Sequence, residues 1–200
     1  MTPDRGQNKL KSMFAQDNPE QLLDAALRAL STDSGWRSIL DEIPVPIYTT
    51  DASGRVTYWN RACIDFAGRE PQLGRDRWCV TWQLFTTAGD PLRHSDCPMA
   101  QAIKEQRPVR DAVAIAERPD GSRVAFRAYP TPLFDDGGSL KGAVNMLLDV
   151  SSEQTKALRA QAEHCRRLAD ATFDPTTTRV LGDMADGLDR IAGQLASKAS

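Results

Sequence analysis

A β-hairpin that leads directly into a helix is the most constraining feature of this chain. Two short runs of β-favouring residues, 47–50 and 55–59, flank an Asp-Ala-Ser-Gly turn at residues 51–54. The glycine can take the positive φ that closing a tight hairpin requires, and the aspartate can accept hydrogen bonds from the turn backbone. Asn60 then stands where it can cap a helix that begins at Arg61. Few folds open with a hairpin that runs straight into a helix.

Composition places the chain among globular proteins without an electrostatic signature for nucleic acid. Its 200 residues suit one domain with extensions, and 40% of them are hydrophobic. Lysine and arginine number 25 against 27 acidic residues, so the net charge of -2 predicts no basic surface for DNA or RNA. No apolar run approaches the roughly 20 residues that cross a bilayer, and the polar N-terminus lacks the apolar stretch of a signal peptide. These features predict a cytoplasmic protein with neither a nucleic-acid nor a membrane partner.

Four cysteines are scattered through the sequence, at positions 63, 79, 97 and 165. They form no Cys-x-x-Cys pair and have no histidine at zinc spacing, so we predict no metal site. Buried, unreactive thiols are the expected state in a reducing compartment. The alternative is a redox-sensing thiol at Cys97, which precedes Pro98 at a predicted helix start, where the helix dipole lowers a thiol pKa.

Changes in composition divide the chain into four segments. Residues 1–17 are polar and are expected to be disordered. Residues 18–42 carry an Asn-Pro-Glu helix start followed by leucines at helical spacing, which predicts two N-terminal helices. Residues 43–151 form a central domain. Residues 152–200 have the charged, helix-forming character of a C-terminal helical hairpin.

The pattern of the central segment predicts an α+β domain. After the hairpin come two helix signals and three strand signals, at residues 61–67, 96–106, 111–117, 122–134 and 140–150. Pro130 and Pro132 indicate that the second half of the middle strand is an edge, a bulge or a kink. This order predicts one five-stranded antiparallel sheet with helices packed on one face.

The last helix carries apolar residues at a strict 3-4-3-4 spacing. These residues are Leu181, Met184, Leu188, Ile191 and Leu195. Two heptads are too short to form a stable isolated helix pair in water, so this seam must pack on the preceding helix, on the sheet or on a second protomer. We predict that it forms the interface of a homodimer.

Several segments of the chain, taken together and in order, resemble the Per-ARNT-Sim (PAS) sensor domain. The resemblance extends over roughly residues 36–151 and rests on the segments 43–48, 50–56, 59–62, 118–122 and 142–145. It implies a stand-alone bacterial PAS protein of sensory or adaptor function, without enzymatic activity. In this family the space between the sheet and the helices holds haem, flavin or a small metabolite, or is filled by side chains.

The end of the last predicted strand reads Leu-Asp-Val-Ser at residues 148–151. It occupies the place of the family's Asp-Ile-Thr ending, where the domain hands over to its output helix. Asp149 and Ser151 can cap the helix and tie it to the sheet. A plain helix cap and a signalling junction are both consistent with these residues.

The sequence argues against flavin and haem. The flavin photosensors' Asn-Cys-Arg-Phe-Leu-Gln motif has no counterpart, since the nearest stretch, residues 74–80, places Cys79 without the neighbours that bind the flavin phosphate. The oxygen sensors of the family carry a proximal histidine on the helix that corresponds to residues 96–106, and this helix has none. His94 lies just before that helix, in a polar segment that is expected to be an exposed loop.

We also predict a small-molecule pocket, although the aromatic and methionine side chains that would line it fill a core more often than they bind a ligand. Its candidate lining residues are Trp82, Phe85, Met99, Ile103, Ile115, Phe126, Tyr129, Asn145 and Met146. Asn145 is the most suggestive because an unpaired buried amide costs about 1–3 kcal/mol, so it should have a partner in the protein, a water or a ligand.

No catalytic constellation is present in the sequence, and no Gly-rich phosphate loop or nucleophile elbow occurs. We therefore expect a sensor that signals to another protein, such as a kinase or regulator. One alternative is a ligand-free dimerisation module. Another is a phosphoacceptor hairpin that uses His164, although the Cys-Arg-Arg sequence that follows lacks the usual acidic neighbour.

Overall fold

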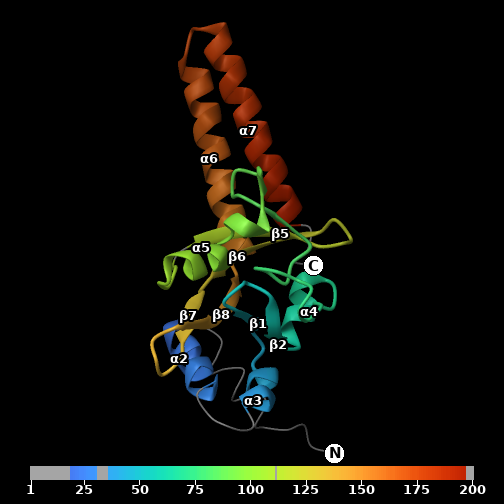
Figure 1. Cartoon of the computed structure of the whole chain (residues 1–200). Helices are drawn as coiled ribbons and strands as arrows, with labels where there is room; N and C mark the ends of the chain where they lie inside the picture. Colours follow the sequence, from blue (N-terminus) through green and yellow to red (C-terminus); the bar gives the residue numbers. More distant parts are fainter. Residues whose placement is uncertain (1–18, 31–35, 111, 197–200) are drawn as a thin grey trace, which may run out of the picture.

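The computed structural model describes residues 19–30, 36–110 and 112–196. The expected disorder of residues 1–17, the helix cap at Asn18 and the break at residues 31–35 lie outside these ranges. Within them the chain forms an antiparallel sheet with helices on both faces, and two long helices project from one end (Figure 1).

Eight strands of the described residues form one antiparallel sheet, in the order β2-β1-β8-β6-β5-β3-β4, with β7 also paired to β8. The strands are β1 (Ile47–Asp51), β2 (Val56–Trp59), β3 (Gln83–Phe85), β4 (Pro91–Leu92), β5 (Ala112–Glu117), β6 (Arg123–Ala128), β7 (Thr131–Phe134) and β8 (Leu140–Asp149). The predicted α+β sheet is confirmed. Strand β8 lies at its centre and pairs with β1, β6 and β7.

The strand expected over residues 122–134 is a single strand with a break. Its two parts, β6 and β7, keep one register on β8, because Ala128 pairs with Leu147 and Thr131 pairs with Val144. The break falls at residues 129–130, where Pro130 has no N–H to donate. The predicted kink is therefore present. Counted as one, these two parts complete the five expected strands.

Strands β3 and β4 extend the sheet beyond this prediction. No strand is predicted between residues 67 and 96, whereas β3 pairs with β5 and β4 pairs with β3. Strands of three and two residues carry no periodic pattern, so their pairing depends on the edge that β5 presents.

Three hairpin turns are held by an aspartate that accepts backbone hydrogen bonds. At the first turn, the Asp51 carboxylate accepts from the N–H groups of Ser53 and Arg55 at 2.9 Å each, and Gly54 has a φ of 82°. Asp120 and Asp135 have the same role in the later turns. The turn chemistry predicted for residues 51–54 is confirmed.

Two short helices cover one face of the sheet. Helix α4 (Ala62–Ala67) ends at Gly68, which is left-handed with φ 66°, and α5 (Pro98–Glu105) follows the 3-10 turn η1 (His94–Asp96). Between these helices and the sheet lies the main core, which includes Phe66, Met99 and Phe126.

The opposite face of the sheet is shared by the two terminal helix pairs. Helices α2 (Pro19–Leu30) and α3 (Trp36–Glu42) pack at one end, and α6 (Ser151–Ala171) and α7 (Pro175–Ala196) pack at the other. Figure 1 shows α6 and α7 side by side, projecting away from the body at the end remote from α2 and α3. Because strand residues alternate between faces, Ile47 faces the α2–α3 cluster and Tyr48 faces the main core.

Asn60 does not cap α4, contrary to the sequence-based expectation. The N-cap position is Arg61, and it makes no side-chain cap hydrogen bond. The buried Asn60 amide instead joins β1 to the segment before it. Its Oδ1 accepts from the Ile47 N–H at 2.9 Å, and its Nδ2 donates to the carbonyls of Leu40, Ile43 and Val45. A buried amide must find hydrogen-bond partners inside the protein, and the Asn60 side chain finds them in backbone groups of residues 40–47 and not at the start of α4.

Candidate sensory site

A cavity of about 440 Å³ lies beside η1, under the loop that connects α4 to β3. It is lined by Arg69, Arg75, Asp76, Arg77, Trp78, Cys79, Thr81, Trp82 and His94. All of these residues except His94 come from one 14-residue stretch, 69–82. Of the nine side chains, three are guanidinium groups and one is a carboxylate, so the lining is strongly basic.

Backbone hydrogen bonds to the opening hairpin hold this loop in place. The Trp78 N–H donates to the Gly54 carbonyl at 2.7 Å, and the Gly74 N–H donates to the Val56 carbonyl at 2.9 Å. The Trp78 ring lies against Gly54, where an added Cβ would come within 2.2 Å of the indole. Only glycine fits at that contact. Trp78 itself has a φ of 69°, a strained conformation for a bulky residue that is typical of functional loops.

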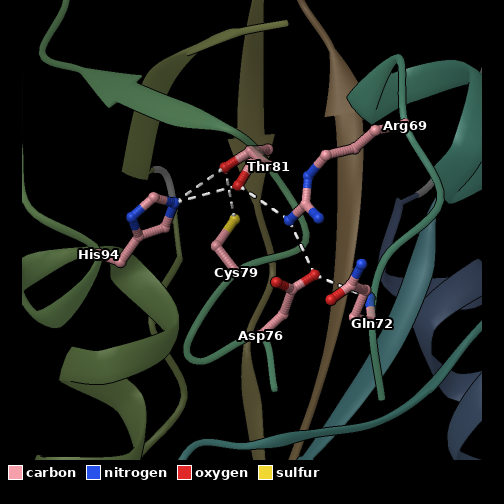
Figure 2. A network of polar contacts seen from close by, with 6 residues as sticks. All are labelled: Arg69, Gln72, Asp76, Cys79, Thr81 and His94. Atoms are coloured by element: carbon pink, nitrogen blue, oxygen red, sulfur yellow. Dashed lines mark hydrogen bonds and ion pairs between the residues drawn. The ribbon is translucent and has the colours of Figure 1, made fainter. Parts of the chain in front are cut away.

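An ion pair forms the floor of the cavity. Arg69 Nη2 lies 2.8 Å from Asp76 Oδ2, which also accepts a hydrogen bond from the Gln72 N–H at 2.9 Å. The same Nη2 atom donates to the Thr81 carbonyl at 3.4 Å (Figure 2). Arg69 Nε is buried and has no hydrogen-bond partner in the part of the chain that the structure describes. The guanidinium is therefore anchored at one edge and unsatisfied at another.

His94 was expected in an exposed loop, and the structure corrects this. The ring is half-buried, and its Nε2 lies 3.2 Å from the Thr81 carbonyl. Figure 2 shows Thr81 between His94 and Arg69. Burial is the main cause that lowers the pKa of His94 below 6.5, and the charge of Arg69 lowers it further. At neutral pH the ring is therefore uncharged and its Nε2–H donates to Thr81.

Two further arginines lie at the solvent-facing rim of the cavity. Arg75 and Arg77 are both exposed. Arg77 donates to the Ser53 carbonyl at 2.6 Å and its guanidinium lies 5.3 Å from the centre of the Trp78 ring. Trp82, on the same rim, is 53% exposed. The mouth of the cavity thus combines exposed positive charge with accessible aromatic surface.

A chain of buried hydrogen bonds connects the loop to the central strand. Asn145 Oδ1 accepts from the Tyr129 N–H at 3.0 Å, its Nδ2 donates to Tyr48 Oη at 3.0 Å, and Tyr48 donates to the Trp78 carbonyl at 3.0 Å. Burial raises the pKa of Tyr48 well above 10.0, so the hydroxyl keeps the proton that it donates. The expectation that Asn145 has a hydrogen-bond partner is confirmed. Its partners, Tyr129 and Tyr48, both belong to the protein.

The nine residues proposed for a single pocket are not brought together. Met99, Ile103 and Phe126 belong to the main core, and Asn145 reaches it through Tyr48. Tyr129 and Met146 pack against α2 and α3. Phe85 and Ile115 pack against α7, and Trp82 alone lines the cavity. Alternation along the strands separates neighbours such as Asn145 and Met146 onto opposite faces.

The thiol of Cys97 differs from the activated thiol considered above. It is buried, and burial raises its pKa to about 12, with nearby Cys79 contributing in the same direction. Burial also raises the pKa of Cys63. These causes outweigh the helix N-terminus at Pro98, so the redox hypothesis for Cys97 loses its physical basis.

At the end of β8 the chain passes into α6 without leaving the sheet ladder. The Ser151 N–H donates to Asp149 Oδ1 at 2.9 Å, and Ser151 Oγ accepts from the Ala125 N–H at 3.0 Å. The Val150 N–H donates to the Ala125 carbonyl at 2.9 Å. Both residues predicted for the junction therefore make contacts there, and Ser151 bonds to β6 as well as to the helix start.

The seam predicted on α7 divides into two halves. Leu188, Ile191 and Leu195 pack with Ile115 and Ala125 of the sheet in the same chain, and Leu195 is only 2% exposed. Met184 is 52% exposed. It lines an apolar groove between the helices, with Ala160, Gln161, His164, Cys165 and Leu188. Leu181 is half-buried.

These features define a class of protein: an α+β domain with one antiparallel sheet, a cavity formed by residues 69–82 and a long helix that continues its central strand. The described residues contain no cluster of His, Cys, Asp or Glu that could hold a metal ion. None of the helices in the described ranges is long and apolar enough to cross a membrane.

Comparison with known proteins identifies the family. Residues 40–155 match the family model described as the PAS fold, so the chain belongs to the PAS family. It is also 30% identical over 177 residues to the C4-dicarboxylate transport sensor protein DctS of Rhodobacter capsulatus. That match covers 86% of this chain and 25% of DctS, so the chain spans about a quarter of the relative's length.

Two solved structures show what the fold resembles. The Rhodobacter sphaeroides LOV protein is 16% identical with a TM-score of 0.47, covering 87% of this chain and 96% of that one. A PAS domain from Colwellia psychrerythraea is 16% identical with a TM-score of 0.41, covering 56% of this chain and 92% of that one.

Proposed function

We propose that this chain is a non-enzymatic sensory or adaptor module in signal transduction. It relays events at residues 69–82, here called the input loop, to the C-terminal helices through Asp149–Ser151. The observation that carries this proposal is the pair of hydrogen bonds that joins Ala125 of β6 to the junction. Its carbonyl accepts from Val150 and its N–H donates to Ser151 Oγ. The first residue of α6 is thereby part of the sheet, and a shift of the sheet must move the helix.

The hydrogen-bond chain inside the core supports a route to that junction. Trp78 of the loop, Tyr48 of β1 and Asn145 of β8 are connected in sequence. Asn145 lies four residues before Asp149 on a strand that is buried on both faces. A strand packed on both sides transmits displacement along its length because its neighbours do not leave room for local relaxation.

A pair of matched hydroxyl deletions tests this route. Tyr48→Phe removes the link to Trp78, whereas Tyr58→Phe removes an equivalent bond to Asp41 on the other face. We expect amide hydrogen exchange to increase in residues 149–158 for Tyr48→Phe and to remain at the wild-type rate there for Tyr58→Phe. Equal exchange of residues 149–158 in the two variants would contradict the relay.

A second function, dimerisation through the hairpin, is favoured by the exposed apolar surface of its distal half. Leu168 is 45% exposed, Val180 49% and Met184 52%. Apolar side chains gathered on one helix pair mark interaction surfaces. We propose that a second copy of the chain covers this surface, so the predicted homodimer uses the distal half of α7, while the half that includes Leu195 packs internally.

Sedimentation velocity tests the dimer. Met184→Glu is expected to convert it to a monomer, and Ser152→Glu, an equal charge change at an exposed site near the start of α6, is expected to leave it intact. A dimer that survives Met184→Glu would exclude this surface.

The phosphoacceptor alternative remains a prediction. His164 is exposed on α6, and phosphate transfer from a partner kinase that persists in His164→Ala would exclude this residue.

A further inference from the structure

The cavity at residues 69–82 has an uncompensated positive charge. Arg69, Arg75 and Arg77 contribute three guanidinium groups, and Asp76 is the only carboxylate among its lining residues. Asp76 engages Arg69 at 2.8 Å, while Arg75 and Arg77 are exposed at the rim. His94 adds no charge at neutral pH, because it is held uncharged against Thr81. A small anion that enters this space meets guanidinium groups from several directions.

The walls of the cavity are aromatic. Trp78 and Trp82 both line it, and Trp82 leaves half of its surface accessible. An exposed indole beside a concave basic surface provides apolar contact for the body of a ligand whose charged end is bound by arginine. A volume of about 440 Å³ lies within the usual range for small-molecule sites.

We propose that this cavity binds a small organic anion, with its carboxylate or phosphate group against the arginines and a planar or apolar body against Trp78 and Trp82. The assignment rests on the proposed sensory function and names the chemical class of its input. Arg77 is the central contact, since its guanidinium lies over the Trp78 ring and can pair with the anion from that position. Arg69, paired with Asp76, lies at the floor of the cavity and has a buried Nε that is left without a hydrogen-bond partner in the described residues.

The position of the site explains how occupancy reaches the core. The Trp78 carbonyl accepts the Tyr48 hydroxyl, and the strained Trp78 backbone is held by Gly54 on the other side. A ligand that packs on the indole changes the balance of contacts on a residue already in an unfavourable conformation. Trp78 therefore belongs both to the lining of the cavity and to the buried hydrogen bonds that connect it through Tyr48 to Asn145.

Binding is tested with benzoate and phenyl phosphate as probes, and with benzyl alcohol as the neutral match. We expect saturable chemical-shift changes at the indole N–H signals of Trp78 and Trp82 in proton–nitrogen spectra of the full chain for at least one of the anions. We expect none for benzyl alcohol. A response to only one anion distinguishes a carboxylate from a phosphate ligand. Equal binding of benzyl alcohol, or no saturation by either anion, overturns the assignment.

Paired substitutions locate the charge. Arg75→Gln with Arg77→Gln is expected to weaken anion binding at least about tenfold, in line with the loss of charge-assisted hydrogen bonds. Arg159→Gln with Arg179→Gln, two exposed arginines of the hairpin, removes the same charge and is expected to leave binding unchanged. Equal affinity of the two double variants overturns the site.

The same samples separate the site from the relay. Anion binding that leaves hydrogen exchange in residues 149–158 unchanged supports the site and counts against the proposed route to α6. An effect of Tyr48→Phe on that exchange, together with no anion binding by the wild type, supports the route and overturns the site.

Discussion

The PAS body and the distal half of the helical hairpin are stabilised in different ways. In the body, buried amides and hydroxyls such as Asn60, Asn145 and Tyr48 are hydrogen-bonded across distant segments. The distal hairpin has no comparable network in the described residues. Its apolar side chains Leu168 and Met184 are about half exposed, and it is held by surface ion pairs such as Arg166 with Asp189 at 2.6 Å.

Under the proposed function, this difference assigns sensing to the body and output to the hairpin. The body has one tightly specified arrangement, so under the proposed function a perturbation at residues 69–82 is transmitted rather than absorbed. The distal hairpin gains little from its own packing, because exposed ion pairs contribute only about 0–1 kcal/mol each. Under the proposed function its arrangement depends on the partner that covers it, so a small tilt of α6 changes that contact.

The largest expected effect on stability comes from removing the Asn60 amide. Asn60→Ala leaves the Ile47 N–H and the carbonyls of Ile43 and Val45 in the interior without their partner, so the free energy of unfolding should fall by about 3 kcal/mol or more. Urea denaturation measures it. The control is Gln72→Ala, an exposed amide, for which a change within about 0.5 kcal/mol is expected. Similar losses in both variants would show that the body does not depend on this buried amide.

Truncations on α7 compare its two halves directly. Leu195→Ala removes a side chain buried against the sheet and should lower the free energy of unfolding by about 2–4 kcal/mol. Met184→Ala, in the distal half, should change it by less than about 0.5 kcal/mol when measured on the monomer. Thermal or urea unfolding at low protein concentration distinguishes them. If the two losses are alike, the distal half is as well packed as the proximal half.

The buried chain of hydrogen bonds should show coupling. Tyr48→Phe and Asn145→Ala each remove a partner from the other, so we expect each variant to lose about 1–3 kcal/mol. The double variant should lose less than the sum, by about 0.5 kcal/mol or more, because the residues share one interaction. Strict additivity in the denaturation cycle would mean that the two side chains act independently.

The smallest effect concerns pH. Burial lowers the pKa of His94 below 6.5, so the folded state favours the neutral ring. This contribution is fully present above the unfolded-state pKa and is lost as the pH falls through the folded-state pKa. The stability difference between the wild type and His94→Gln should therefore shrink as the pH falls from 7 to 5. An NMR titration of His94 that gives a pKa above 6.5 would contradict this assignment.

Features that depend on local chemistry were predictable from the sequence. The first turn follows from Asp51 and Gly54, because the carboxylate and the positive φ act within four residues. The strand break follows from Pro130, which has no donor. The buried partner of Asn145 follows from the cost of an unpaired amide, although the sequence did not indicate that Tyr48 supplies it.

Features that depend on chain folding over long distances were not predictable. His94 is half-buried because the loop after Asp76 folds against it, and nothing near His94 in the sequence indicates this. The sequence itself argues against one pocket for all nine residues, since adjacent strand residues such as Asn145 and Met146 must face opposite sides. A signal for the basic cavity was also present: three arginines and two tryptophans gather in residues 69–82, a stretch with little regular structure.

The contacts of Asn60 also determine where this domain can be cut. Its amide requires the carbonyls of Leu40, Ile43 and Val45, so a fragment that begins at the first strand would expose a hydrogen-bonding group with nothing to bind. The smallest unit that can be moved into another protein therefore starts no later than residue 40. A fusion protein or a recombinant fragment that begins at Ile47, the first residue of β1, would lose the seven residues 40–46, which the interior cannot replace.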